Sequence, residues 1–218
     1  MEFIELATGS LPTASVIWLH GLGADGHDFE PIVPELRLPP ALQVRFIFPH
    51  APVRPVTLNN GMRMRAWYDN LRLDGGAEDA AGIRASQGLV GDLIQAEKKK
   101  GVAAERIVLA GFSQGGAIAL QTALRYPSRL AGVLALSTYL PLAATLKAEM
   151  GEANRSVPIF MAHGEYDDII PLARAEQSAK ALQDAGCKVQ WHTYPMPHSV
   201  CPEEIAHIAA FLRAVLPD

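Results

Sequence analysis

Residues 106–124 read RIVLAGFSQGGAIALQTAL, and this stretch decides how the chain folds. The apolar run 107–110 predicts a strand buried on both faces, and the helix-forming run 116–124 predicts a helix. Between them, Ser113 occupies the centre of a Gly-x-Ser-x-Gly turn, where backbone passes too close for side chains at the flanking positions. A strained serine at a strand-to-helix turn, beside a helix N-terminus that favours negative charge, indicates a nucleophile. The alternative is a glycine-rich connection with an inert serine.

The composition is that of an ordinary globular protein, with 218 residues of which 49% are hydrophobic and 19% are charged. This length predicts one domain, residues 1–218. The net charge of -4 argues against a nucleic-acid partner, for which a basic surplus is typical. Neither a basic-then-apolar leader nor an apolar run of membrane-spanning length appears, so we expect a cytoplasmic protein with no membrane span. The two cysteines, Cys187 and Cys201, provide no disulfide framework, and at Cys201 a small apolar filler is favoured over a reactive thiol.

Predicted strands and helices alternate along the rest of the chain. Strands are expected at 15–19, 43–48, 107–110, 130–136, 157–162 and 188–194. Helices are expected near 29–36 and at 78–99, 116–124, 141–150, 172–185 and 203–216. The alternation predicts an α/β protein with a mostly parallel sheet covered by helices on both faces. The connection 51–76 is expected to be irregular and, because of its length, functional.

Several residues able to do chemistry follow the predicted strands directly. Ser113 comes after one strand, the adjacent aspartates 167–168 after a later one, and His198 after the last. Ligands of such sheets bind at the carboxyl ends of the strands, and a serine nucleophile needs a base and a carboxylate that orients it. The order Ser, Asp, His therefore indicates a catalytic triad, although position alone does not choose between the two aspartates. His20 and His163 also stand at strand ends, each before a glycine, and are interpreted as turn-supporting residues.

The glycine-rich stretch 21–26 reads GLGADG and matches the dinucleotide fingerprint Gly-x-Gly-x-x-Gly. That use requires an acidic residue about twenty positions later, where this chain has Phe46 and Phe48. The alternative is an oxyanion hole, formed by the backbone amides of Leu22 and Gln114. A zinc motif of the His-Glu-x-x-His type and a Gly-Lys-Ser/Thr phosphate loop are both absent from the sequence, so no metal is expected.

Taken together, these motifs resemble the acyl-protein thioesterase and bacterial carboxylesterase family of α/β-hydrolases. The resemblance covers nearly the whole chain and rests on His20–Gly26, Ala66–Asp69, Gly111–Gly116, His163–Gly164 with Asp167, and Pro197–His198. It implies hydrolysis of carboxylic esters or thioesters by Ser113, Asp167 and His198, with the Leu22 and Gln114 amides as the oxyanion hole and no cofactor. It also selects Asp167 through the pattern His-Gly-x-x-Asp, which leaves Asp168 to face solvent or to cap a helix. Glu165–Tyr166 lies where the family varies.

The substrate is less sharply defined than the chemistry. No insertion is long enough for a separate lid domain, so an open site is expected. Candidates for an acyl-binding groove, with core packing as the alternative for each, are Trp67, Leu71, Leu73, Leu140 and Met196. The resemblance allows an acylated protein or a lysophospholipid as substrate. Two other functions stay open, an acyltransferase or perhydrolase on the same scaffold and a catalytically silent binding module, and so does a homodimeric state.

Overall fold

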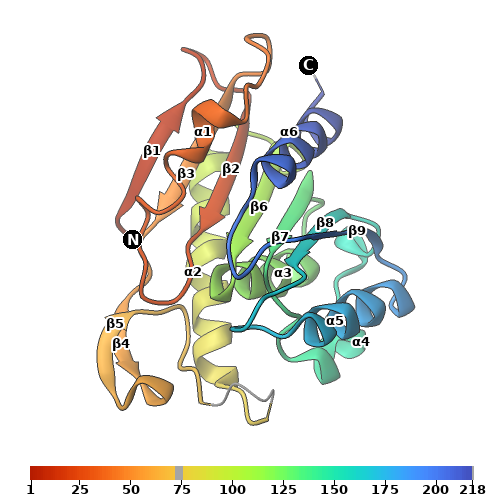
Figure 1. Cartoon of the computed structure of the whole chain (residues 1–218). Coiled ribbons are helices and arrows are strands. Elements are labelled where there is room, and N and C mark those ends of the chain that lie inside the picture. The colour runs from red at the N-terminus through yellow and green to blue at the C-terminus, as the bar shows by residue number, and fades with distance from the viewer. Residues whose placement is uncertain (72–75, 218) are drawn as a thin grey trace.

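The computed structural model describes residues 1–71 and 76–217, and a twisted sheet with helices on both faces forms its centre (Figure 1). The strands are β1 Phe3–Ala7, β2 Ala14–Leu19, β3 Val44–Pro49, β4 Val53–Val56, β5 Met62–Arg65, β6 Ile107–Phe112, β7 Gly132–Leu136, β8 Pro158–Gly164 and β9 Lys188–Tyr194. The α-helices are α1 Ile32–Glu35, α2 Ala80–Lys99, α3 Gln114–Arg125, α4 Leu146–Glu149, α5 Leu172–Asp184 and α6 Pro202–Val215.

Seven of these strands form the main sheet in the order β1-β3-β2-β6-β7-β8-β9. All neighbours from β3 to β9 pair in parallel, and β1 alone pairs antiparallel, with β3. The predicted parallel sheet is confirmed. The edge strand β1 was not predicted, because it is short, exposed on alternate residues and held by one partner only.

Two hydrophobic cores lie on opposite faces of the sheet, and β2 shows how they are separated. Its Val16 and Trp18 point into a core that α1 and α6 cover, whereas Ile17 and Leu19 point into a core that α2, α3 and α5 cover. All four side chains are at most 1% exposed, as expected of a central parallel strand. This layered arrangement confirms the predicted α/β class, with helices on both faces (Figure 1).

The connection between β3 and α2 differs from the irregular loop that was expected. It contains a two-stranded antiparallel hairpin, β4 and β5, which lies outside the main sheet (Figure 1). Asn60 and Gly61 lie between its strands with φ angles of 55° and 76°, a left-handed conformation that an Asn-Gly pair adopts readily. This dipeptide was the available signal, but Pro55 and the arginines of the two strands obscured it. In the described part of this connection the hairpin is the only regular sheet structure, and no separate lid domain forms.

All six predicted helices differ from the structure by at least one residue at an end, and three of these differences have a visible cause or divide the helix. The helix expected near 29–36 is only the single turn α1, which includes Pro34 and directly follows Pro31. The one expected at 141–150 divides into a 3-10 turn, Ala143–Thr145, and the short α4. The long helix α2 begins at Ala80, because the Asp79 side chain caps it by accepting a hydrogen bond of 2.9 Å from the Gly82 amide.

A buried carboxylate joins three elements at the amino-terminal end of the sheet. Glu97 of α2 is 1% exposed and accepts hydrogen bonds from Ser15 of β2 at 2.7 Å and Arg45 of β3 at 2.8 Å. Lys100 adds an ion pair at 2.9 Å. Burial alone would raise the pKa of Glu97, but the hydrogen bonds from Ser15, Lys100 and Arg45 lower it, so the carboxylate is charged. This polar cluster fastens α2 to the sheet, at the end away from Ser113.

None of the described helices has the length and apolar character needed to cross a lipid bilayer.

Candidate active site

The carboxyl ends of the parallel strands bring the sequence-predicted residues to one edge. In the sheet register Leu19 is opposite Gly111, Phe112 is opposite Leu136, and Gly164 is opposite Tyr194. The segments that directly follow these strands therefore start at the same level. They are the segments that contain the residues 20–22, 113–114, 167 and 198.

Ser113 lies at the sharp turn between β6 and α3. Its φ of 54° and ψ of -121° are unfavourable for a residue with a side chain, which is the backbone strain expected of a nucleophile elbow. The surroundings hold it there, because its amide donates to Leu136 O at 2.9 Å and its carbonyl accepts from Thr138 Oγ1 at 2.6 Å. The turn therefore presents the Ser113 side chain at the sheet edge, as predicted.

The two glycines that flank Ser113 are required by close approach of backbone. A Cβ added to Gly111 would lie 2.3 Å from the carbonyl carbon of Gly115, and one added to Gly115 would lie 2.3 Å from Leu19 O. Real Cβ atoms essentially never approach heavy atoms to less than 3.0 Å. The expectation that side chains do not fit at these positions is confirmed.

The loop after β2 passes beside the elbow. A Cβ added to Gly21 would lie 3.6 Å from Cβ of Ser113, and the Gly23 amide donates to Arg65 O of β5 at 2.9 Å. His20 supports this loop with both ring nitrogens: Nδ1 donates to Gly21 O at 2.7 Å, and Nε2 accepts from the Ala51 amide at 3.0 Å. Burial lowers the pKa of His20, so the ring is neutral and has this one tautomer. The turn-supporting role predicted for His20 is confirmed.

Asp167 and His198 form a direct hydrogen bond. Nδ1 of His198 lies 2.7 Å from Oδ2 of Asp167, and Oδ1 of the same carboxylate accepts from the amides of Ile169 at 2.9 Å and Ile170 at 2.8 Å. The carboxylate is fully buried, whereas the imidazole remains 16% exposed. The neighbouring Asp168 is exposed, as expected. The bond to Asp167 places the proton of a neutral His198 on Nδ1 and leaves Nε2 free to act as a base.

The imidazole of His198 lies against the elbow. Its ring centroid is 4.7 Å from that of Phe112, the residue before Ser113. In the described part of the chain Ser113 and His198 share no hydrogen bond, a contact that commonly tightens only when substrate binds. The arrangement places the strained Ser113 turn beside an imidazole that Asp167 orients.

The residues predicted for an acyl groove are mostly inside the protein. Trp67 is 0% exposed, and Leu140 and Met196 are each 5% exposed, which favours the alternative of core packing for these three. Leu71 is half-buried, and Leu73 lies outside the described residues. Trp67 also donates its indole N–H to His20 O at 2.9 Å, so it braces the loop that passes beside Ser113.

The side chain of Gln114 has a role that the sequence analysis missed. It is 3% exposed, accepts from the Trp67 amide at 2.7 Å, and donates to Tyr68 O at 2.8 Å and Asn70 Oδ1 at 3.1 Å. These bonds attach the connection after β5 to the start of α3. The only local signal was a polar residue at the start of a largely apolar helix, and it did not reveal partners more than forty positions away.

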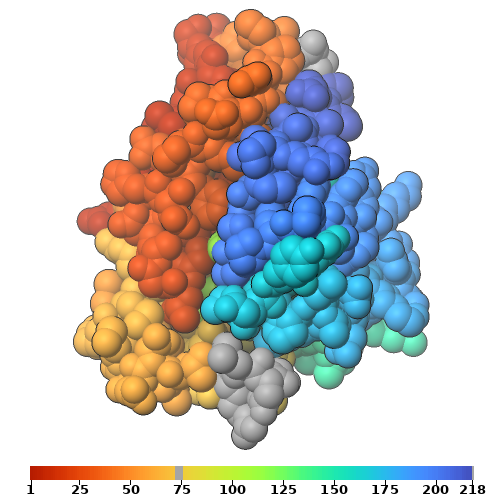
Figure 2. All heavy atoms as spheres, in the orientation of Figure 1, coloured from red at the N-terminus to blue at the C-terminus, as the bar shows by residue number. Residues whose placement is uncertain are grey.

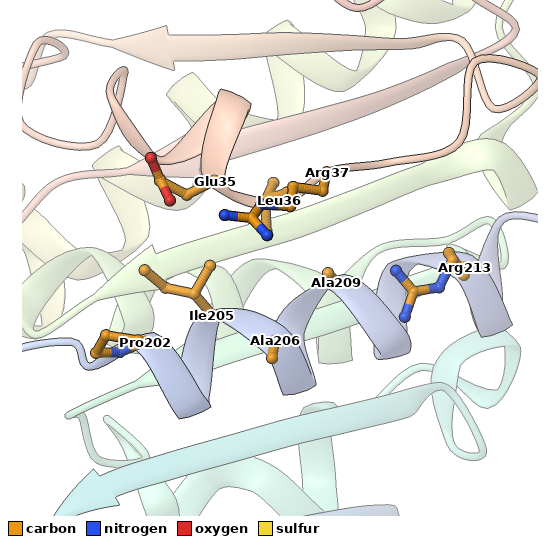
Figure 3. Close-up of a pocket in the computed structure, with 8 residues that line it drawn as sticks. All are labelled: Glu35, Leu36, Arg37, Pro202, Ile205, Ala206, Ala209 and Arg213. Carbon is orange, nitrogen blue, oxygen red and sulfur yellow. The ribbon is translucent and has the colours of Figure 1, made fainter.

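A groove lies elsewhere on the surface, between α1 and α6. Figure 2 shows it as a furrow between the orange and blue segments, and Arg37 and Arg213 reach into it from the two sides (Figure 3). Its lining includes none of the residues predicted for the active site. Among the described residues, histidine, cysteine and acidic side chains form no group suited to a metal ion.

Comparison with known proteins gives consistent similarities over nearly the full chain. The sequence profile of the phospholipase/carboxylesterase family matches residues 4–216. An acyl-protein thioesterase 1 of Gibberella zeae is 45% identical over 94% of this chain and 92% of that protein, and one of Mycosarcoma maydis is 42% identical over 98% and 96%. The crystal structure of Arabidopsis thaliana SOBER1 superposes with a TM-score of 0.89 at 30% identity, covering 93% of this chain and 99% of that one.

Proposed function

Because this chain belongs to the phospholipase/carboxylesterase family of α/β-hydrolases, we propose that Ser113, His198 and Asp167 are the catalytic triad with which it cleaves carboxylic esters and acyl thioesters. The chain is a hydrolase, as the family and its thioesterase relatives establish. The observation that carries the assignment of residues is the 2.7 Å hydrogen bond between His198 and Asp167, beside a serine held at a φ of 54°.

The proposed reaction proceeds through an acyl-enzyme. Ser113 Oγ attacks the acyl carbon while Nε2 of His198 takes its proton, and Asp167 stabilises the imidazolium that forms. The backbone amides of Leu22 and Gln114 donate to the oxyanion of the tetrahedral intermediate. The ester or thioester bond breaks as the leaving alcohol or thiol takes the proton from His198. Water then attacks the acyl-enzyme while His198 takes its proton; the bond between the acyl carbon and Ser113 Oγ breaks, the carboxylic acid leaves, and His198 returns the proton to Ser113. Each step uses groups of this chain and water.

The position of Leu22 supports its part in the oxyanion hole. It lies between Gly21, which approaches Ser113, and Gly23, whose amide is anchored to β5. The Gln114 amide is the first of α3 and points from the helix N-terminus, where backbone N–H groups and the helix dipole favour an anion. In this arrangement the backbone amides of Leu22 and Gln114, which belong to different elements, both donate to the oxyanion.

We propose an acylated protein or a lysophospholipid as the natural substrate, since the relatives are named as acyl-protein thioesterases and the family as phospholipases and carboxylesterases. Leu71 is the half-buried candidate for contact with the acyl chain. A cytoplasmic location is part of the proposal and is supported by the thiols of Cys187 and Cys201, both of which are free.

A fluorophosphonate probe tests the proposed nucleophile. We expect it to label Ser113 in the parent enzyme, and Ser113→Ala to fold normally and to lose about three to six decades of turnover. Labelling of a different serine in active enzyme would refute the assignment. A series of p-nitrophenyl esters and acyl thioesters of increasing chain length then defines the substrate class.

A further inference from the structure

His163 is a second imidazole at the proposed triad. It belongs to β8, is 0% exposed, and its Nε2 lies 3.2 Å from Oδ2 of Asp167. This is the same oxygen that accepts from Nδ1 of His198 at 2.7 Å. The proposed mechanism gives His163 no part, although it lies as close to the carboxylate as a hydrogen-bond partner does.

The contacts of His163 define its tautomer. Nε2 faces two acceptors, Ile170 O at 2.8 Å and the Asp167 carboxylate, so the proton must be on this nitrogen. Nδ1 is buried and has no hydrogen-bond partner in the described part of the chain. A second proton there would leave a buried donor unsatisfied, which is costly. Burial also lowers the pKa of His163, and the ring is neutral.

The same N–H therefore connects two parts of the loop that follows β8. Through Ile170 O it ties the far end of the loop back to the strand, and Ile170 in turn donates its amide to Oδ1 of Asp167 at 2.8 Å. Through its 3.2 Å approach to Oδ2 it limits the rotation of the carboxylate itself. The N–H thus donates to Ile170 O, and the Asp167 carboxylate lies beside the same nitrogen as a second polar contact.

We propose that His163 is a positioning residue: its Nε2–H, which donates to Ile170 O and lies 3.2 Å from Oδ2 of Asp167, holds the carboxylate in the orientation that directs Oδ2 to His198. The inference rests on the proposed triad and adds a fourth member to it. His163 does not touch the substrate or the reacting atoms. It acts by holding the group that orients the base.

The proposal has a consequence for the pH profile. A donor close to Oδ2 withdraws negative charge that would otherwise stabilise the imidazolium of His198. When this donor is removed, the imidazolium of His198 persists to higher pH, so the midpoint of the rise of kcat/KM should shift to higher pH. The charged or titratable groups facing His163 are Asp167 on its own loop, His198 after β9 and Glu176 on α5.

Two substitutions distinguish the effect of the Nε2–H donor of His163 from the effect of its ring. His163→Phe keeps a ring against Trp191, whose centroid is 6.5 Å away, but has no donor. His163→Gln keeps a donor near the position of Nε2. With p-nitrophenyl acetate as probe, we expect His163→Phe to lose about 10- to 100-fold in kcat with little change in KM, and its pH midpoint to rise by about 0.5–1 unit. We expect His163→Gln to have nearly the parent's kcat and nearly the parent's pH midpoint.

Two controls distinguish positioning from a merely structural role. In an Asp167→Asn background, His163→Phe should cost less than about threefold, because it acts through Asp167. His192→Phe on the neighbouring β9, a half-buried histidine remote from the triad contacts, should leave the pH profile unchanged. Equal losses in His163→Phe and His163→Gln, an unshifted profile, or additivity with Asp167→Asn would overturn the proposal.

A measurement on the parent protein keeps the test decisive even if His163→Phe does not fold. Nitrogen-15 NMR of histidine-labelled protein should show His163 neutral with its proton on Nε2 from about pH 6 to 9. A proton on Nδ1 would overturn the inference. This readout does not depend on turnover, so it stands apart from the fluorophosphonate test, which alone decides whether Ser113 is the nucleophile.

Discussion

Adding one methyl group at Gly115 should separate the proposed nucleophile, Ser113, from the loop that is proposed to bind the oxyanion. A Cβ there would lie 2.3 Å from Leu19 O and 2.6 Å from His20 O, whereas ordinary contact begins at 3.4 Å. The end of β2 and the start of α3 must therefore move apart by about 1 Å, and neither atom belongs to a flexible side chain. A displacement of this size commonly costs about 100-fold in kcat, and forced overpacking about 1–3 kcal/mol of stability.

The matched control is Gly88→Ala, on the exposed side of α2. Its added Cβ would meet nothing within 4 Å, and alanine is the better helix former, so we expect a gain of about 0.5–1 kcal/mol and unchanged turnover. Urea unfolding followed by circular dichroism gives the stabilities, and hydrolysis of p-nitrophenyl acetate gives kcat. If Gly115→Ala has the parent's unfolding midpoint and a kcat within threefold of the parent, the close approach of the two loops does not control the site.

Three further predictions concern single residues. Asp167→Asn should lose about four decades in kcat, and the exposed Asp168→Asn less than one; the opposite ranking would place the triad off by one residue. Burial raises the pKa of Glu204 to about 8, from about 4.5 in the unfolded chain. Between these two values the folded state binds one more proton than the unfolded state, so the stability of the parent falls as pH rises toward 8. The stability of Glu204→Gln relative to the parent should therefore increase by up to about 1.4 kcal/mol per pH unit in this window, and urea midpoints that run parallel with pH would contradict this. Trp67→Phe should lower kcat/KM equally for short and long acyl esters, and a changed chain-length preference would return Trp67 to the acyl site.

The convergence of Ser113, Asp167 and His198 could be predicted because it follows from strand order alone. Parallel strands buried on both faces are near-continuous apolar runs, and their carboxyl ends meet at one edge. The choice of Asp167 over Asp168 needed more than position. The structure shows the physical difference, since one carboxylate is buried among N–H donors and the other is exposed.

The parts that were missed depend on pairs of residues distant in the sequence. Gln114 and Trp67 are joined across 47 positions, and the local sequence around each does not indicate that the other is its partner. The strand β1 gains its partner only when Val44–Pro49 is already in the sheet. The hairpin of β4 and β5 had a local signal in Asn60–Gly61, which proline and arginine in its strands concealed. Local patterns predict elements, but partners of this kind emerge only from the folded chain.

The position of the Glu97 cluster has a consequence for engineering this enzyme. The Glu97 carboxylate contacts Ser15, Arg45 and Lys100 at the end of the sheet away from Ser113, so this cluster shares no residue with the proposed triad. Free energies of substitutions at distant sites without common partners are usually additive. Changes that reinforce this end should therefore combine with changes of specificity at the other end, and the two can be optimised in separate rounds.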